Sequence, residues 1–140
     1  MKLVLNLKSN CSFWQPDETD IACLKKRLAP IEVVQMDEKD LDVLCDADFY
    51  CGWNFSQEWL DVASKLKLIV VPSAGKDYLP LDAIEAKMIP VVTGTGYHAI
   101  PMSEQIMAYI LGFARGIFQT FDCRKTKKWW KDEEIGRAHV

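Results

Sequence analysis

Five short apolar runs alternate along this chain with segments whose apolar residues recur at helical spacing. Short continuous apolar runs, rich in β-branched residues, are typical of strands buried in a parallel sheet. They occupy residues 3–7, 31–35, 48–51, 68–71 and 89–93. Unbroken alternation of strands and helices predicts an α/β domain in which helices cover both faces of one parallel sheet.

The last predicted helix is the longest. Ser103 followed by Glu104 fits an N-cap with an acidic first turn, and apolar residues continue at helical spacing as far as Phe118. The earlier helices are expected to begin near Pro16, Glu38 and Leu81 and after the N-cap Ser56. Residues 10–15 are expected to form a loop. For five strands, the natural closure is a flavodoxin-like, doubly wound five-stranded parallel sheet that ends in a long helix.

Charge and cysteine content exclude several classes of protein. The net charge of −3 at pH 7 argues against a nucleic-acid-binding surface. The chain has five cysteines, an odd number, and no C-x-x-C spacing, which argues against a disulfide framework or a zinc site and favours a reducing compartment. No apolar run has the length of a signal peptide or a membrane span. We therefore expect a cytoplasmic domain with no metal site and no membrane or nucleic-acid partner.

The turn after the fourth predicted strand is the strongest candidate binding site. Pro72 ends the strand, and Ser73, Ala74 and Gly75 form a small-residue turn at its carboxyl end. Ligands of open parallel sheets bind at this edge, and uncovered backbone N–H groups receive carboxylates or phosphates. Trp53 and Asn54 follow the third strand at the same edge and are candidate substrate-cleft residues. An ordinary strand-to-helix turn, with Trp53 as a buried cover over a loop, is the alternative.

Two other features resemble functional motifs. Gly94–Ala99 matches the dinucleotide fingerprint G-x-G-x-x-A. We reject it because Pro101 and Ser103 place the helix start too late, and because no strand ending in an acid follows roughly 20 residues on. His98 is a candidate general acid or base, but the sequence identifies no carboxylate partner, and a polar surface role is the alternative. We see no Ser/His/Asp arrangement, and we take Ser103 as a cap and not as a nucleophile.

Three stretches together resemble one enzyme family. Residues 65–77 resemble the substrate-domain signature of the D-isomer-specific 2-hydroxyacid dehydrogenases, in which a "pLk" run leads into a strand and then S-(A/V)-G-x-D. Residues 86–92 match "a..rgI.V", and residues 102–107 with Arg115 match "vAEh.l" and a later arginine on one long helix. The resemblance covers about residues 47–115, and it rests on the order and spacing of these pieces together.

The resemblance implies one half of a two-domain enzyme. In this family the first, flavodoxin-like domain holds the substrate. A second, Rossmann domain holds NAD or NADP together with the catalytic arginine, glutamate and histidine, and the long helix commonly lies at a dimer interface. The implied reaction is hydride transfer between the cofactor and C2 of a small 2-hydroxy or 2-keto acid.

The resemblance also assigns roles to individual residues. The N–H groups of Ala74 and Gly75 would hold the substrate carboxylate, and Met102 would lie near the nicotinamide ring. Lys76 stands where the family usually has an apolar residue.

The end of the chain departs from the family pattern. Residues 135–140, Ile-Gly-Arg-Ala-His-Val, match a peptide that a common sequencing-library adapter encodes in one reading frame, and Glu134 fits the codon that this frame requires. We expect a substrate-binding domain over residues 1–134, a non-native tail, and no Rossmann domain, so the fragment is expected to be inactive. The alternative is a free-standing flavodoxin-like module that binds a small carboxylate without catalysis. A receiver-type signalling domain is disfavoured, because no pair of acids follows the first strand.

Overall fold

The computed structural model describes residues 1–9, 15–37 and 40–127. The chain forms two compact units, Met1–Thr95 and Gly96–Val140, and each is described by itself. Residues 10–14 of the expected loop and the predicted non-native tail at residues 135–140 lie outside the described residues.

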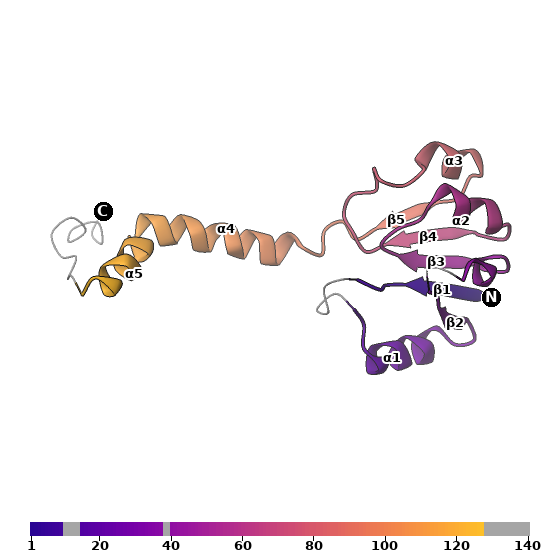
Figure 1. Ribbon diagram of the computed structural model, residues 1–140, viewed down its shortest axis with the longest axis horizontal. Helices are drawn as coiled ribbons and strands as arrows, with labels where there is room; N and C mark the ends of the chain where they lie inside the picture. Colours follow the sequence, from indigo (N-terminus) through magenta and orange to yellow (C-terminus); the bar gives the residue numbers. More distant parts are fainter. Residues whose placement is uncertain (10–14, 38–39, 128–140) are drawn as a thin grey trace. The chain divides into compact units, whose positions relative to one another are not determined.

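The first unit contains a five-stranded parallel sheet, as predicted (Figure 1). Its strands are β1 (Lys2–Asn6), β2 (Glu32–Gln35), β3 (Phe49–Gly52), β4 (Leu68–Val71) and β5 (Val91–Thr93), in the order β2-β1-β3-β4-β5. Every neighbouring pair is parallel. All five carboxyl ends therefore lie along one edge, with β3, β4 and β5 side by side.

Among the described residues of this unit, four short helices connect the strands. They are α1 (Glu18–Leu28), the 3-10 helix η2 (Leu41–Leu44), α2 (Gln57–Val62) and α3 (Leu81–Ala86). Asp17 caps α1 in a capping box with Asp20, and Ser56 caps α2 by accepting from the Trp59 N–H. Both caps satisfy backbone donors that have no partner inside their helices.

Helices cover both faces of the sheet, which confirms the doubly wound prediction. On one face Val4, Tyr50 and Ile69 form a core with residues of η2, α2 and α3. On the other face Leu3, Leu5 and Val33 pack against Ile21 of α1. In Figure 1, α1 lies beside β2, and α2 and α3 lie toward β4 and β5. These two apolar layers hold the carboxyl edge in place.

The helical unit differs from the predicted single long helix in two respects. It contains α4 (Ala99–Ala114) and α5 (Ile117–Lys125), separated at Gly116, whose φ of 63° is left-handed and ends α4. The predicted N-cap Ser103 is wrong, because α4 begins at Ala99 and the Ser103 hydroxyl donates to the Ile100 carbonyl at 2.8 Å. Pro101 is tolerated in the first turn, where an N–H has no partner in the helix anyway.

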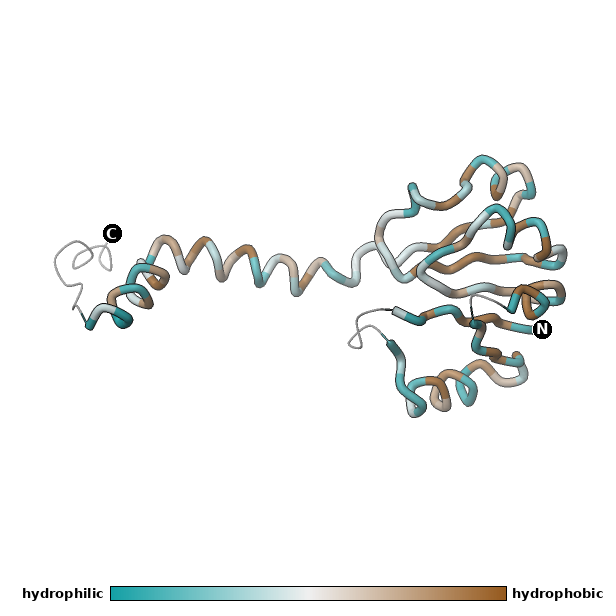
Figure 2. Tube along the Cα trace, viewed as in Figure 1, coloured by the Kyte–Doolittle hydropathy of each residue, from teal (hydrophilic) through white to brown (hydrophobic). Residues whose placement is uncertain are grey.

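The colouring in Figure 2 shows apolar residues recurring along the whole of α4. Even so, none of the helices in the described part of the chain has the length and apolar character needed to cross a membrane.

Gly52, at the end of β3, is the most tightly enclosed glycine of the sheet. A Cβ added there would lie 2.3 Å from Tyr50 Oη and 2.6 Å from the Asn6 carbonyl oxygen. Tyr50 is fully buried and its hydroxyl donates to the Asn54 carbonyl, so neither neighbour has room to withdraw. The close approach of β1 and β3 at this edge therefore depends on a residue without a side chain.

We predict that Gly52→Ala lowers the free energy of unfolding by about 1–3 kcal/mol, the usual cost of overpacking a core. Urea unfolding of the chain, followed by circular dichroism, measures this. Gly75→Ala is the matched control, since its Cβ would meet only Asp77 Oδ1, at 3.3 Å. Equal stability of Gly52→Ala and the unsubstituted chain would contradict the packing seen here.

Candidate functional site at the carboxyl edge of the sheet

The turn that follows β4 has an exposed backbone. Val71 is fully buried, Ser73 is half-buried, and Ala74 and Gly75 are exposed. The hydrogen bonds formed among the described residues include none donated by the N–H groups of Ala74 and Gly75. These two amides are therefore available to a ligand at this edge of the sheet.

A hydrogen bond from β5 determines which way the first of these amides points. The Gly94 N–H donates to two carbonyls of the neighbouring segment, Val71 at 3.0 Å and Ser73 at 2.9 Å. In a planar trans peptide the C=O of one residue and the N–H of the next point in opposite directions. Because the Ser73 carbonyl points toward Gly94, the Ala74 N–H points away from the end of β5.

The Ser73 side chain supports the turn from within. Its Oγ donates to the Gly75 carbonyl at 2.8 Å and lies 2.5 Å from the Tyr78 hydroxyl. A serine hydroxyl has one proton. Since that proton is directed to Gly75, Tyr78 is the donor in the second contact. Ser73 therefore holds the turn with its side chain, while the backbone amides that follow it face outward.

Trp53 and Asn54 lie at the carboxyl end of β3, next to β4. The Trp53 indole N–H donates to the Leu7 carbonyl at 3.3 Å, and its backbone N–H donates to the Asn6 carbonyl at 3.2 Å. Trp53 is half-buried and its polar atoms join the ends of β1 and β3, so it offers a ligand mainly its ring. Asn54 is exposed. Both residues share the edge of the turn, as predicted, and their binding roles remain predictions.

His98 and Met102 belong to the helical unit. His98 is the N-cap residue of α4, without a capping bond from its side chain, and its ring centroid lies 3.9 Å from that of Tyr97. Met102, in the first turns of α4, is 60% exposed. Its role near a cofactor remains a prediction.

The loop Gly94–Ala99 does not have the geometry of a dinucleotide site. The Gly94 amide is used by the Val71 and Ser73 carbonyls. Contrary to the expectation, α4 does begin within the motif, at Ala99, so the late helix start was the wrong reason for rejecting it. The second reason holds for the part of the chain that is described, because residues 99–125 are helical apart from the break at Arg115 and Gly116, and no strand follows them up to residue 127. This loop therefore does not have the strand–turn–helix–strand arrangement of a pyrophosphate site.

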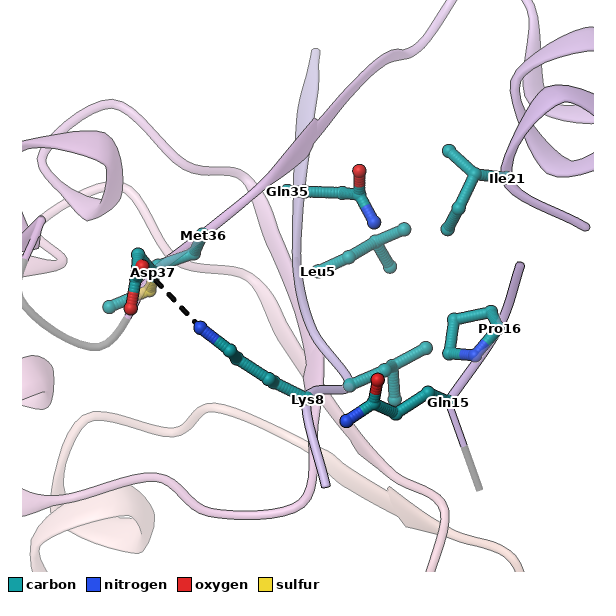
Figure 3. A pocket seen from close by; sticks show the side chains of 9 residues that line it. Leu5, Lys8, Gln15, Pro16, Ile21, Gln35, Met36 and Asp37 are labelled. Atoms are coloured by element: carbon teal, nitrogen blue, oxygen red, sulfur yellow. Dashed lines mark ion pairs between the residues drawn. The ribbon is translucent and has the colours of Figure 1, made fainter. Parts of the chain in front are cut away.

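Figure 3 shows a pocket of about 330 Å³ elsewhere on the carboxyl edge, beside β1 and β2. It is lined by Leu5, Leu7, Lys8, Gln15, Pro16, Ile21, Gln35, Met36 and Asp37. Lys8, the one cation among these residues, lies 3.6 Å from Asp37, and both side chains are about two-thirds exposed, at 68% and 67%. A bound anion would compete with Asp37 for this lysine. The turn after β4 therefore remains the better anion site.

Cys51 lies in β3, close to the same edge, but it is not a candidate nucleophile. Burial raises the pKa of its thiol to about 11. Because the thiolate is the reactive form, Cys51 stays largely unreactive at neutral pH. Among the described residues, no group of three or more His, Cys, Asp or Glu side chains is placed to hold a metal ion. The exposed amides of Ala74 and Gly75 therefore remain the candidate binding groups at this edge.

Sequence reasoning missed the residues that orient the turn. No sequence pattern points to Tyr78, and the sequence places Gly94 in a loop near the turn without indicating that its N–H holds the turn. Tyr78 lies five residues after Ser73, and only the fold shows that its hydroxyl returns to that side chain. The Gly94 contact depends on the pairing of β4 with β5, which no local pattern specifies.

Comparisons with known proteins agree with this architecture. Residues 11–121 match the family model "D-isomer specific 2-hydroxyacid dehydrogenase, catalytic domain". Formate dehydrogenase 1 of Saccharomyces cerevisiae is 27% identical over 95 residues, which are 68% of this chain and 25% of that protein. The chain thus spans a quarter of the length of this relative.

Two solved structures share the fold. The NAD complex of the NAD-dependent formate dehydrogenase from Staphylococcus aureus has a TM-score of 0.71 and 20% identity, over 92% of this chain and 42% of that one. A D-lactate dehydrogenase from Treponema pallidum has a TM-score of 0.74 and 17% identity, over 96% and 42%. At these identities the structural likeness shows the fold alone.

We predict that Gly75→Val weakens the binding of a small carboxylate about tenfold, the effect of losing one hydrogen bond to a charged group. The valine Cβ would lie 3.3 Å from Asp77 Oδ1, and its methyl groups would crowd the neighbouring amides. Gly75 does not adopt a positive φ, so the expected effect of the valine is steric and does not include an unfavourable backbone angle. Titration of pyruvate into the ¹⁵N-labelled chain, followed by amide chemical shifts, gives the dissociation constants.

Gly75→Ala is the control, because one methyl group requires only a small movement of Asp77. Pyruvate binding unaffected by Gly75→Val would remove the turn from consideration as the carboxylate site.

Proposed function

Because the chain belongs to the D-isomer specific 2-hydroxyacid dehydrogenase family, as a catalytic domain, we propose that it is the substrate-binding part of an NAD(P)-dependent oxidoreductase. The intact enzyme would transfer hydride between the cofactor and C2 of a small 2-hydroxy or 2-keto acid. The observation that supports this is the pair of outward-facing amides at Ala74 and Gly75. Backbone amides of this kind receive the carboxylate that all such substrates share.

The proposal assigns each candidate residue a role. The Ala74 and Gly75 amides bind the carboxylate, Ser73 holds the turn, and Trp53 and Asn54 line the substrate cleft. We assign the binding of NAD or NADP mainly to polypeptide outside the described residues, since the loop Gly94–Ala99 lacks the arrangement of a dinucleotide-phosphate site. Met102 is the proposed contact of this chain with the cofactor.

A non-catalytic module that binds a small carboxylate is the second candidate. One observation favours it: burial raises the pKa of the Cys51 thiol to about 11, which keeps this potential nucleophile protonated. The genomic sequence downstream of the codon for Glu134 separates the two functions. A Rossmann fingerprint within a few dozen codons supports the dehydrogenase, and a native stop codon supports the module.

The partner and compartment are also part of the proposal. We propose a homodimer for the intact protein, formed through α4. Apolar side chains occupy consecutive positions of this helix, and Ile106, Ile110 and Phe113 are 54%, 54% and 66% exposed. A helix that is apolar all round is normally buried.

We propose a cytoplasmic location because Cys23, Cys45, Cys51 and Cys123 are all unpaired thiols, as expected in a reducing compartment.

The 140-residue chain is predicted to have no dehydrogenase activity of its own, because its sequence shows no cofactor fingerprint and no catalytic base with an identified partner. The assay follows the absorbance of NADH with glyoxylate or hydroxypyruvate as the acceptor, with an enzyme-free blank. Oxidation of NADH above the blank would refute this prediction.

We also predict that the chain self-associates through α4, since exposed apolar patches of this kind drive association. Light scattering coupled to size exclusion should detect a dimer or a larger soluble species. Ile110→Asp should shift the distribution toward the monomer, whereas Glu104→Gln, also on α4, should leave it unchanged. A monomer at high concentration would argue against a dimer interface on this helix.

A further inference from the structure

A threonine side chain two residues after β5 contacts the peptide group that joins Ala74 and Gly75. Thr95 Oγ1 donates to the Ala74 carbonyl at 3.3 Å, and it lies 2.7 Å from Thr93 Oγ1. All of these atoms belong to the first unit. Thr93 is half-buried and Thr95 is exposed.

The direction of both hydrogen bonds follows from the number of protons. Each threonine hydroxyl has one proton and two lone pairs. The Ala74 carbonyl only accepts, so Thr95 must give it its single proton. Thr95 Oγ1 then has only lone pairs for the contact with Thr93, and Thr93 is the donor there. The two hydroxyls form a chain that runs from Thr93 through Thr95 to the turn.

The consequence concerns the Gly75 amide. The peptide that joins Ala74 and Gly75 is trans, so its N–H points opposite to its carbonyl. With the Ala74 carbonyl held toward Thr95, the Gly75 N–H points away from the end of β5. The Ala74 N–H has the same general direction, because Gly94 holds the Ser73 carbonyl. Two consecutive amides thus face one side of the turn, each oriented through the carbonyl of its own peptide.

We propose that Thr95 is a positioning residue for the carboxylate site, a proposal that rests on the function proposed above. Thr95 does not touch the ligand. It orients the Gly75 amide by holding the Ala74 carbonyl, and Thr93 orders the Thr95 hydroxyl. The Gly94 N–H, directly after β5, does not take this role, because it is already shared between the Val71 and Ser73 carbonyls.

Residual dipolar couplings of the ¹⁵N-labelled chain in a weakly aligning medium measure the orientation of each N–H directly. Thr95→Val keeps the shape of the side chain and removes the hydroxyl, whereas Thr95→Ser keeps the hydroxyl. We expect the coupling of Gly75 to change in Thr95→Val and to return in Thr95→Ser. The coupling of Ala74 should stay the same in both, because Gly94 still orients that peptide. Thr93→Val should produce a smaller change at Gly75.

Titration with pyruvate in the same samples tests the connection to binding. Thr95→Val should raise the dissociation constant about 3- to 10-fold, the effect of one hydrogen bond, and Thr95→Ser should restore it. Pyruvamide, which has no charge, is the ligand control and should not shift the Ala74 and Gly75 amides.

The outcomes separate this inference from the function on which it rests. An unchanged Gly75 coupling in Thr95→Val overturns the positioning role, whatever binds at the turn. A changed coupling together with no response of either amide to pyruvate in the unsubstituted chain overturns the carboxylate site and leaves the orientation itself established. Equal pyruvate affinity of Thr95→Val and the unsubstituted chain also overturns the proposal.

Discussion

The hydrogen bond that the Gly94 N–H shares between Val71 and Ser73 connects the fold to the candidate site. It extends the pairing of β4 with β5 beyond the last paired residues, Val71 and Thr93. The turn after β4 is thereby held against the end of a strand that is itself part of the sheet. Apolar packing of Val71 and Ile69 fixes β4, and β4 in turn fixes where the turn can lie. The orientation of the site is thus a consequence of sheet register.

Most of the fold could be predicted because its signals are local. The apolar run Leu68–Val71 and the helix Leu81–Ala86 have the bounds expected from the sequence. Pro72, which has no N–H to donate, ends the strand, and Pro80 directly precedes the helix. The last strand begins two residues later than expected. The Ile89 N–H closes the end of α3 by donating to the Ile84 carbonyl at 3.2 Å, so Ile89 belongs to the helix end and not to the strand. An apolar pattern alone does not show whether an isoleucine closes the end of a helix or begins a strand.

The errors in the helical unit and the gaps at the site have physical causes. Ser103 and Pro101 were interpreted as the start of a helix, whereas the first turn of α4 accommodates the proline without loss of a hydrogen bond. The composition of the turn at Ser73–Gly75 was enough to indicate exposed amides. The composition did not indicate the direction in which these amides point. That direction depends on the contact between Thr95 and Ala74, which are 21 residues apart in the chain. Contacts of that kind exist only after the sheet has formed.

An anion receptor made of peptide amides has no titrating group. Between weakly acidic and weakly alkaline conditions its donors keep the same charge and the same number of protons, unlike a site built from histidine or lysine. Substitutions cannot remove a backbone amide, except by proline, so variation among related sequences would alter the surroundings of the ligand and leave the donors in place. Lys76, exposed directly after the turn, is one such neighbour. A scaffold of this type can change which acid it prefers, because every such acid presents a carboxylate group to the same amides.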